Sequence, residues 1–114
     1  MTKIIGITGG IGSGKTTVCD YLKKNNFAVH ESDKVVAHMY SKPNKLFLNF
    51  LKKNISKEVV INNKINKQKI TDIIFKNPKT KKVLESYVHK QVKKHRDSFI
   101  KKNIKKKLST VFVD

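Results

Sequence analysis

A glycine-rich segment near the N-terminus has the residue types and the spacing to hold a phosphate chain. From Gly9 the sequence reads Gly-Gly-Ile-Gly-Ser-Gly-Lys-Thr, which fits the P-loop pattern G-x-x-x-x-G-K-[ST]. Glycines let a backbone approach a ligand closely, and its amides can then point into one anion-binding concavity. Lys15 could reach the β- and γ-phosphates of a nucleotide, and the Thr16 hydroxyl could bind Mg²⁺.

The segments on either side of this motif supply the context that it needs. Residues 3–7 form a β-branched apolar run, typical of a buried parallel strand, and residues 17–24 have the pattern of a helix. A strand, a glycine loop and a helix in that order direct the loop amides toward a ligand at a helix N-terminus. The alternative is a plain turn with a solvated Lys15, and it is disfavoured because both flanks agree with the motif.

A carboxylate that could orient or deprotonate an acceptor hydroxyl follows the second expected strand. Residues 27–30 read as that strand, and Asp33 lies just beyond its carboxyl end. Ligands of open α/β sheets bind at the carboxyl ends of strands, so we expect Asp33 on the same sheet edge as the P-loop. Glu31 lies two residues earlier and could assist. The alternative role for Asp33 is to cap a helix predicted over residues 34–40.

The remainder of the chain alternates between helical patterns and short breaks. Residues 45–107 read as helical with interruptions, one of them a turn at Asn62-Asn63-Lys64 and another a helix start at Pro78. Residues 109–114 read as a third strand. We therefore predict an α/β fold in which a parallel sheet carries helices on both faces and a helical insertion separates its second and third strands.

The predicted domain organisation follows from this layout. Residues 1–40 and 108–114 would form the nucleotide-binding core, and residues 41–107 would form the helical, acceptor-binding insertion. A chain of 114 residues is short for a P-loop enzyme, which needs several βα units, so we expect an incomplete fold without a lid.

The composition is strongly basic, with 26 Lys and Arg residues against 8 Asp and Glu residues and a formal net charge of +18. One interpretation is a polyanionic partner such as nucleic acid. The other is compositional bias. It is favoured because nearly all the basic residues are lysine, whereas specific base recognition favours arginine. We expect no specific nucleic-acid partner.

The cysteine content and the hydropathy of the sequence indicate the cellular compartment that we expect. The single cysteine, Cys19, excludes a disulfide framework and fits a reducing, cytoplasmic compartment. The N-terminus has no signal-peptide pattern, and no segment approaches the roughly 18 apolar residues of a membrane span. We expect no membrane partner. The four histidines show no metal-ligand spacing, so no zinc site is predicted.

These motifs together resemble the N-terminal portion of the dephospho-coenzyme A kinase family. Residues 5–18 match the family almost letter for letter, and the form Thr-Gly-Gly-Ile-Gly-Ser-Gly-Lys is much more specific than a general P-loop. Asp33 matches the end of the family's D-A-D segment. Leu84-Glu85 with His89 matches its L-E-x-x-x-H-P, and residues 111–114 match the strand that leads into P-L-L-x-E.

The sequence departs from the family pattern at several positions. Glu31 replaces the first Asp of D-A-D, and Lys90 replaces the Pro after His89. His38 and Lys67 stand where the family has Arg, and an Arg-to-Lys change loses bidentate phosphate recognition. The arginine-bearing lid and the adenine-contacting C-terminal part have no counterpart in the 114 residues.

The resemblance implies an enzyme with a P-loop NTPase fold like that of nucleoside monophosphate kinases. It would use ATP and Mg²⁺ to phosphorylate the ribose 3′-hydroxyl of dephospho-CoA, the last step of coenzyme A biosynthesis. Lys15 and Asp33 would be catalytic, and Thr16 would bind the metal. The acceptor would contact Glu31, Lys67 and His89. The ATP phosphates would be held by Ile11, Gly12, Ser13, Gly14, Lys15, Thr16 and Thr17.

Two other functions remain open at this point. The chain could belong to another small-molecule P-loop kinase, which a panel of acceptors would reveal. It could also be a truncated, non-catalytic fragment that binds nucleotides or polyanions.

Overall fold

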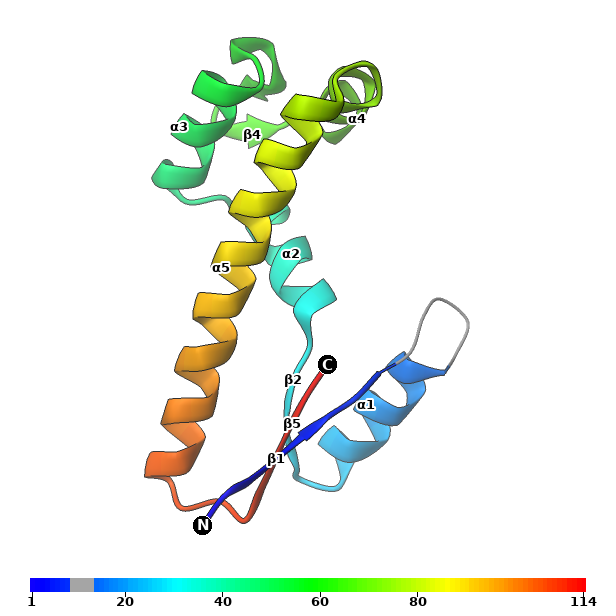
Figure 1. Ribbon diagram of the computed structural model, residues 1–114, viewed down its shortest axis with the longest axis vertical. Coiled ribbons are helices and arrows are strands. Elements are labelled where there is room, and N and C mark those ends of the chain that lie inside the picture. The colour runs from blue at the N-terminus through cyan, green and yellow to red at the C-terminus, as the bar shows by residue number, and fades with distance from the viewer. Residues whose placement is uncertain (9–13) are drawn as a thin grey trace. The chain divides into compact units, whose positions relative to one another are not determined.

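The structure is a computed structural model that describes residues 1–8 and 14–114. These residues form two compact units, and Figure 1 labels most of their helices and strands. The first unit comprises Met1–Ser32 and Lys93–Asp114, and the second comprises Asp33–Val92. The second boundary falls inside the long helix α5 (Pro78–Lys105).

A parallel sheet forms the centre of the first unit. Its strands are β1 (Lys3–Gly6), β2 (Ala28–His30) and β5 (Thr110–Val113), in the order β1-β5-β2. Both neighbours run parallel to β5, and Val113 pairs with Gly6 on one side and with His30 on the other. The three predicted strands and their parallel arrangement are confirmed. The register brings all three carboxyl ends to one edge.

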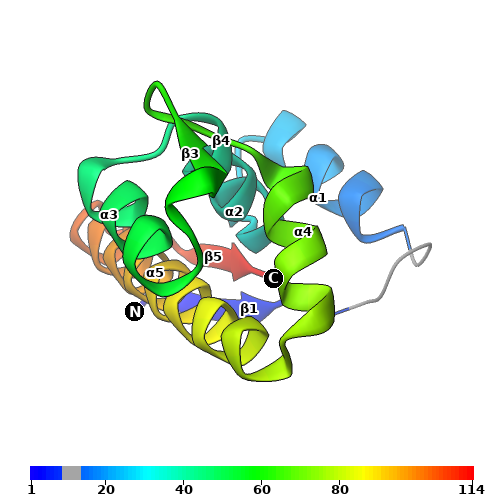
Figure 2. The same cartoon turned by 90° about the horizontal axis from the view of Figure 1, so that it is seen from above.

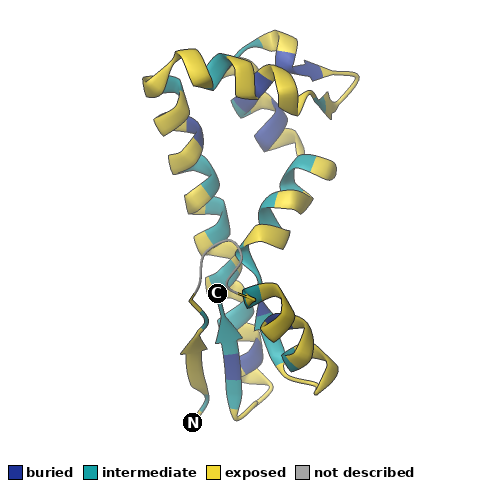
Figure 3. Ribbon diagram, turned by 90° about the vertical axis from the view of Figure 1, so that its right-hand side faces the viewer, coloured by how far each residue is buried: buried dark blue, intermediate teal, exposed yellow. Residues whose placement is uncertain are grey.

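Burial differs sharply across this sheet, as Figure 3 shows. The central strand β5 has the sequence Thr-Val-Phe-Val, and its Val111 is fully buried. A short, continuous apolar run of this kind is typical of a strand covered on both faces. By contrast, every residue of β1 is exposed, although its sequence, Lys-Ile-Ile-Gly, contains two isoleucines. The strand therefore lies at an open sheet edge within the described residues.

Two helical segments flank this sheet (Figure 1). The first is α1 (Lys15–Lys24), which buries Cys19 and ends in two lysines that suit the negative end of a helix dipole. Gly14 precedes it with φ +82°, a left-handed conformation that glycine adopts without steric cost. The second is the C-terminal half of α5, whose Phe99 ring lies 5.3 Å from that of His30.

The second unit is largely helical. Its elements are α2 (Ser32–Ser41), α3 (Lys45–Asn54), the 3-10 turn η1 (Lys57–Val59), β3 (Val60–Ile61), β4 (Lys64–Ile65), α4 (Lys67–Lys76) and the first half of α5. The strands β3 and β4 form a short antiparallel hairpin, which lies between α3 and α4 (Figure 2). The helix α2 spans the boundary between the units, because it begins at Ser32.

The hairpin corrects the helical interpretation of residues 45–107. The turn predicted at Asn62-Asn63-Lys64 exists, but it connects two strands rather than two helices. Asn62 and Asn63 have φ values of 53° and 61°, and a two-residue loop with both φ values positive matches the right-handed twist of a hairpin. Asparagine tolerates this conformation better than most residues. The β-branched neighbours Val60 and Ile61 then favour strand over helix.

The second unit has its own apolar core. Asn44 caps α3 by accepting a hydrogen bond from the Phe47 amide at 2.8 Å, and α3 then buries Phe47 and Leu51 on one face. The Phe47 ring stacks on Tyr87 of α5. The other buried members of this core are Leu48, Val59, Val60, Ile70 and Leu84. The expected division into a core (1–40 and 108–114) and an insertion (41–107) remains a prediction.

Candidate active site

The carboxyl edge of the sheet continues past the strands themselves. The Ile7 amide donates to the Val113 carbonyl at 2.6 Å, and the Asp114 amide donates to the His30 carbonyl at 3.1 Å. Residues that follow the strands therefore leave the sheet next to one another. This is the edge at which the sequence predicts a ligand site.

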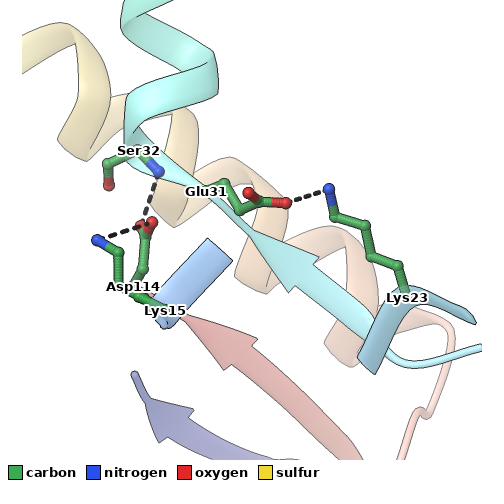
Figure 4. A network of polar contacts seen from close by, with 5 residues as sticks. All are labelled: Lys15, Lys23, Glu31, Ser32 and Asp114. Carbon is green, nitrogen blue, oxygen red and sulfur yellow. Dashed lines mark hydrogen bonds and ion pairs between the residues drawn. The ribbon is translucent and has the colours of Figure 1, made fainter. Parts of the chain in front are cut away.

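Asp114, the residue after β5, contacts both Ser32 and Lys15 (Figure 4). One of its carboxylate oxygens, Oδ1, accepts a hydrogen bond from the Ser32 amide at 2.7 Å. The other, Oδ2, lies 3.5 Å from the Lys15 ammonium at the start of α1. The Asp114 side chain is 2% exposed, whereas that of Lys15 is 23% exposed. The lysine is thus held at the edge of the sheet but can still reach solvent.

The environment keeps Asp114 ionised. Burial raises its pKa, but the hydrogen bonds from Ser32 and the nearby Lys15 ammonium outweigh that effect and place the pKa below its ordinary value. At neutral pH the site therefore contains a buried anion paired with a partly exposed cation. A phosphate group that approached Lys15 would compete with Asp114 for the ammonium.

A second ion pair lies beside the first in Figure 4. Lys23, in the last turn of α1, pairs with Glu31 just after β2. The Glu31 side chain is 9% exposed, so it is nearly enclosed. Its predicted contact with an acceptor stays a prediction, and it would require the acceptor to share this carboxylate with Lys23.

The N-terminus of α1 has no side-chain cap from Gly14, and it presents two threonine hydroxyls in its first turn. Gly14 occupies the capping position and supplies no side chain to the first-turn amides. Thr16 and Thr17 are exposed in that turn. A helix N-terminus of this kind favours anions, because its dipole and its free N–H groups both point toward them. The predicted phosphate contacts Ile11, Gly12 and Ser13 lie outside the described residues.

The other predicted site residues belong to the second unit. Asp33 is exposed in the first turn of α2, and because that helix begins at Ser32, the capping alternative for Asp33 is wrong. Lys67 is exposed at the start of α4, with its ammonium 5.5 Å from the centre of the Tyr40 ring. His89 is exposed on α5. The roles of Asp33, Lys67 and His89 remain predictions. The residues that the structure brings together are Lys15, Ser32 and Asp114.

Three contacts of this site were missed by sequence reasoning. They are the Ser32 amide on Asp114, the pairing of Lys15 with Asp114, and the pairing of Lys23 with Glu31. The available signal was the position of Asp114 directly after an apolar strand, which indicates a sheet edge but does not say which strands lie beside it.

No group of three or more His, Cys, Asp or Glu side chains in residues 1–8 and 14–114 is arranged to hold a metal ion. In the same ranges, no helix is both long enough and apolar enough to cross a bilayer.

Comparison with known proteins decides the family. The family model for dephospho-CoA kinase matches residues 3–114. The chain belongs to the dephospho-CoA kinase family. A dephospho-CoA kinase from Oceanobacillus iheyensis is 34% identical over 109 residues, which covers 91% of this chain and 54% of the relative. One from Streptococcus mutans is 32% identical over 108 residues, covering 89% of this chain and 53% of the relative.

Solved structures show the same P-loop NTPase fold. A dephospho-CoA kinase from Campylobacter jejuni superposes with a TM-score of 0.76 at 20% identity, covering 99% of this chain and 56% of that one. A Thermus thermophilus protein gives a TM-score of 0.71 at 30% identity, covering 99% of this chain and 55% of that one. The chain therefore spans about half the length of the dephospho-CoA kinases that it matches.

Proposed function

We propose that this chain supplies the phosphate-binding edge and the acceptor-binding helices of a dephospho-CoA kinase. The protein would transfer the γ-phosphoryl group of ATP to the ribose 3′-hydroxyl of dephospho-CoA in the cytoplasm. The observation that supports this most strongly is the Lys15–Asp114 pair at the carboxyl edge of a parallel sheet, in a chain of this family. That geometry holds a cation where a helix N-terminus already favours phosphate.

In this proposal the first unit receives the phosphates of ATP. The first-turn amides after Gly14 donate to phosphate oxygens, and the Lys15 ammonium turns from Asp114 toward the transferring group. Mg²⁺ would be held by the Thr16 hydroxyl, whose exposed position and hard oxygen fit this ion, and would offset the charge of the phosphates. Asp114 keeps Lys15 positioned when no phosphate is present.

The acceptor hydroxyl is assigned to Asp33. A carboxylate in the first turn of α2 can accept the proton of the 3′-hydroxyl as the oxygen attacks phosphorus. The Ser32 amide, fixed on Asp114, sets where this helix begins. Glu31, Lys67 and His89 would contact the rest of the acceptor through one carboxylate, one ammonium and one imidazole.

The decisive experiment incubates the protein with ATP, Mg²⁺ and dephospho-CoA and detects coenzyme A by mass spectrometry. Asp33→Asn should lower turnover by about 10²- to 10⁴-fold, because the general base is lost. Asp72→Asn is the matched control, since Asp72 is an exposed carboxylate on α4 that bonds Gln68. Equal activity of the two variants would contradict the role of Asp33.

A second candidate, nucleotide binding without transfer, needs only the first unit, which contains Lys15 and the N-terminus of α1. It predicts that ATP raises the unfolding temperature of the chain although no coenzyme A forms. In either case Lys15→Ala should abolish that stabilisation, whereas Lys24→Ala, at an exposed lysine of the same helix, should retain it. Unchanged ATP binding by Lys15→Ala would refute the assignment of the phosphate site to Lys15.

A further inference from the structure

Two imidazoles of the first unit are hydrogen-bonded to each other, outside the proposed phosphate site. His30 Nε2 lies 2.9 Å from His95 Nδ1. His30 ends β2 and is 2% exposed, whereas His95 is exposed on α5. The Phe99 ring also lies against His30, with ring centres 5.3 Å apart. The contact joins the carboxyl end of β2 to the second half of α5.

The burial of His30 selects one tautomer for this pair. Its other ring nitrogen, Nδ1, is buried and has no hydrogen-bond partner among the described residues. A proton on Nδ1 would be a buried, unsatisfied donor, which is costly and rare. The favourable arrangement therefore puts the proton on His30 Nε2, which donates to the bare Nδ1 of His95. The remaining N–H of His95, on Nε2, belongs to an exposed ring.

This arrangement cannot accept protons without losing its hydrogen bond or stranding a donor. A proton added to His95 must go to Nδ1, the atom that now accepts from His30. His30 would then have to move its own proton to the buried Nδ1. A second proton would leave two N–H groups and two positive charges facing each other, and the contact would open.

The charged groups around His30 act in both directions. Burial lowers its pKa, and the neighbouring His95 and Arg96 of α5 lower it further, while the Asp114 carboxylate beyond β5 raises it. The lowering effects prevail. The neutral pair is therefore the form expected at neutral pH.

The pair is continuous with the contacts around Asp114. The His30 carbonyl accepts the Asp114 amide at 3.1 Å, and two residues later the Ser32 amide donates to the Asp114 carboxylate at 2.7 Å. A displacement of His30 must therefore move both groups that hold Asp114, and Asp114 in turn holds Lys15. Along the chain, only Glu31 separates His30 from Ser32.

We propose that His95 is a positioning residue, which with His30 forms a neutral imidazole pair that holds the end of β2 under Asp114 and opens when protons are taken up. The pair makes the geometry of the phosphate edge sensitive to mild acid. The proposal concerns the described contacts of the first unit and does not depend on the acceptor or on phosphoryl transfer.

The test is an NMR titration of the chain with ¹⁵N-labelled histidine and backbone amides, from about pH 7.5 to about pH 5. At the upper limit we expect His30 in the Nε2–H tautomer. As the imidazole signals titrate, the Ser32 amide signal should move with them. The Asp114 pKa lies below its ordinary value, so that carboxylate stays ionised and does not move the Ser32 signal itself. An Nδ1–H tautomer for His30, or a Ser32 signal that stays constant, would overturn the proposal.

Variants of His95 test whether this residue positions the end of β2 through its hydrogen bond or only packs against it. His95→Leu removes the acceptor and should reduce hydrogen-exchange protection of the Asp114 amide by about five- to tenfold, the effect of one lost hydrogen bond. Lys94→Leu is the matched control at an exposed neighbour on α5. His95→Asn places an amide oxygen near the position of Nδ1 and should restore protection. Equal protection in His95→Leu and Lys94→Leu, or no restoration by His95→Asn, would refute the pair as the cause.

These readouts also separate the pair from the proposed function. Loss of the NMR signature with normal ATP binding would reject the pair alone. A normal signature without any ATP binding would reject the phosphate site alone.

Discussion

The most informative single perturbation is Asp114→Asn, which removes one charge from the centre of the site and keeps its shape. The amide oxygen can still accept from Ser32, so only the charged part of that 2.7 Å bond is lost. Hydrogen bonds to charged groups contribute about 1.5–3 kcal/mol, and neutral ones about 1 kcal/mol. The pairing with Lys15 at 3.5 Å adds about 1 kcal/mol, since that ammonium is partly exposed. We expect a loss of about 2 kcal/mol in the free energy of unfolding at neutral pH.

The pH dependence of this difference gives the sharper check. The pKa of Asp114 is lowered in the folded protein, so the unfolded chain takes up this proton first as the pH falls. The stabilisation is complete above the ordinary pKa of 3.8 and is lost progressively as the pH falls through the lower, folded-state pKa. The stabilities of the wild-type and Asp114→Asn proteins should therefore begin to converge as the pH falls below 3.8, and should meet only below the folded-state pKa.

The assay is guanidinium unfolding followed by circular dichroism, at several pH values from neutral down to the lowest at which the chain folds. Glu85→Gln is the matched control, because Glu85 pairs with Lys81 at 3.7 Å and both side chains are more than half exposed. Such surface pairs contribute about 0.5 kcal/mol or less. A loss in Asp114→Asn no larger than in Glu85→Gln, or one that is constant with pH, would refute the buried pair.

Four further predictions concern the two units separately. Leu51→Ala should lower the free energy of unfolding by about 2–5 kcal/mol, because Leu51 is fully buried. The control is Leu46→Ala, at an exposed position of the same helix, which should change it by less than about 0.5 kcal/mol in the same denaturation assay. Asn63→Gly should be neutral or slightly stabilising and Asn63→Ala destabilising by about 1 kcal/mol in thermal unfolding, because φ is positive there. Burial and the Glu31 and Asp114 charges raise the pKa of Cys19, so its thiol should react with a chromogenic disulfide only after denaturation. Because the pKa of His30 is lowered in the folded protein, its contribution to stability is present above about pH 6.5. Below that pH the free energy of unfolding should fall by up to about 1.4 kcal/mol per pH unit. His30→Gln should make this pH dependence shallower in urea unfolding.

The parts of the fold that could be predicted from sequence are those set by neighbours along the chain. Apolar runs identify all three strands of the sheet, and Pro78 marks the start of α5. The hairpin at Asn62 and Asn63 was missed, because two-residue strands are too short for any periodicity to register. Its signal was the dipeptide itself, flanked by β-branched residues and able to adopt positive φ values.

The candidate site also has local features, which the sequence predicts, and contacts between distant residues, which it does not. The phosphate motif and its flanking helix are local, so the position of Lys15 at the start of α1 followed from spacing. The partners of Asp114 are not local, since Ser32 is 82 positions away along the chain. The partner of His30 is 65 positions away. No pattern within a short window identifies such pairs.

Strand order is what brings these distant residues together. The last strand, β5, lies between the first two, so the residue after it emerges between the segment after β1 and the segment after β2. A side chain at that position can contact both segments at once, and Asp114 does so through its two carboxylate oxygens. If the central position of β5 is the cause, then Asp114→Asn should disturb the Lys15 ammonium and the Ser32 amide together. A change at one of them without the other would mean that the two contacts form independently of the strand between them.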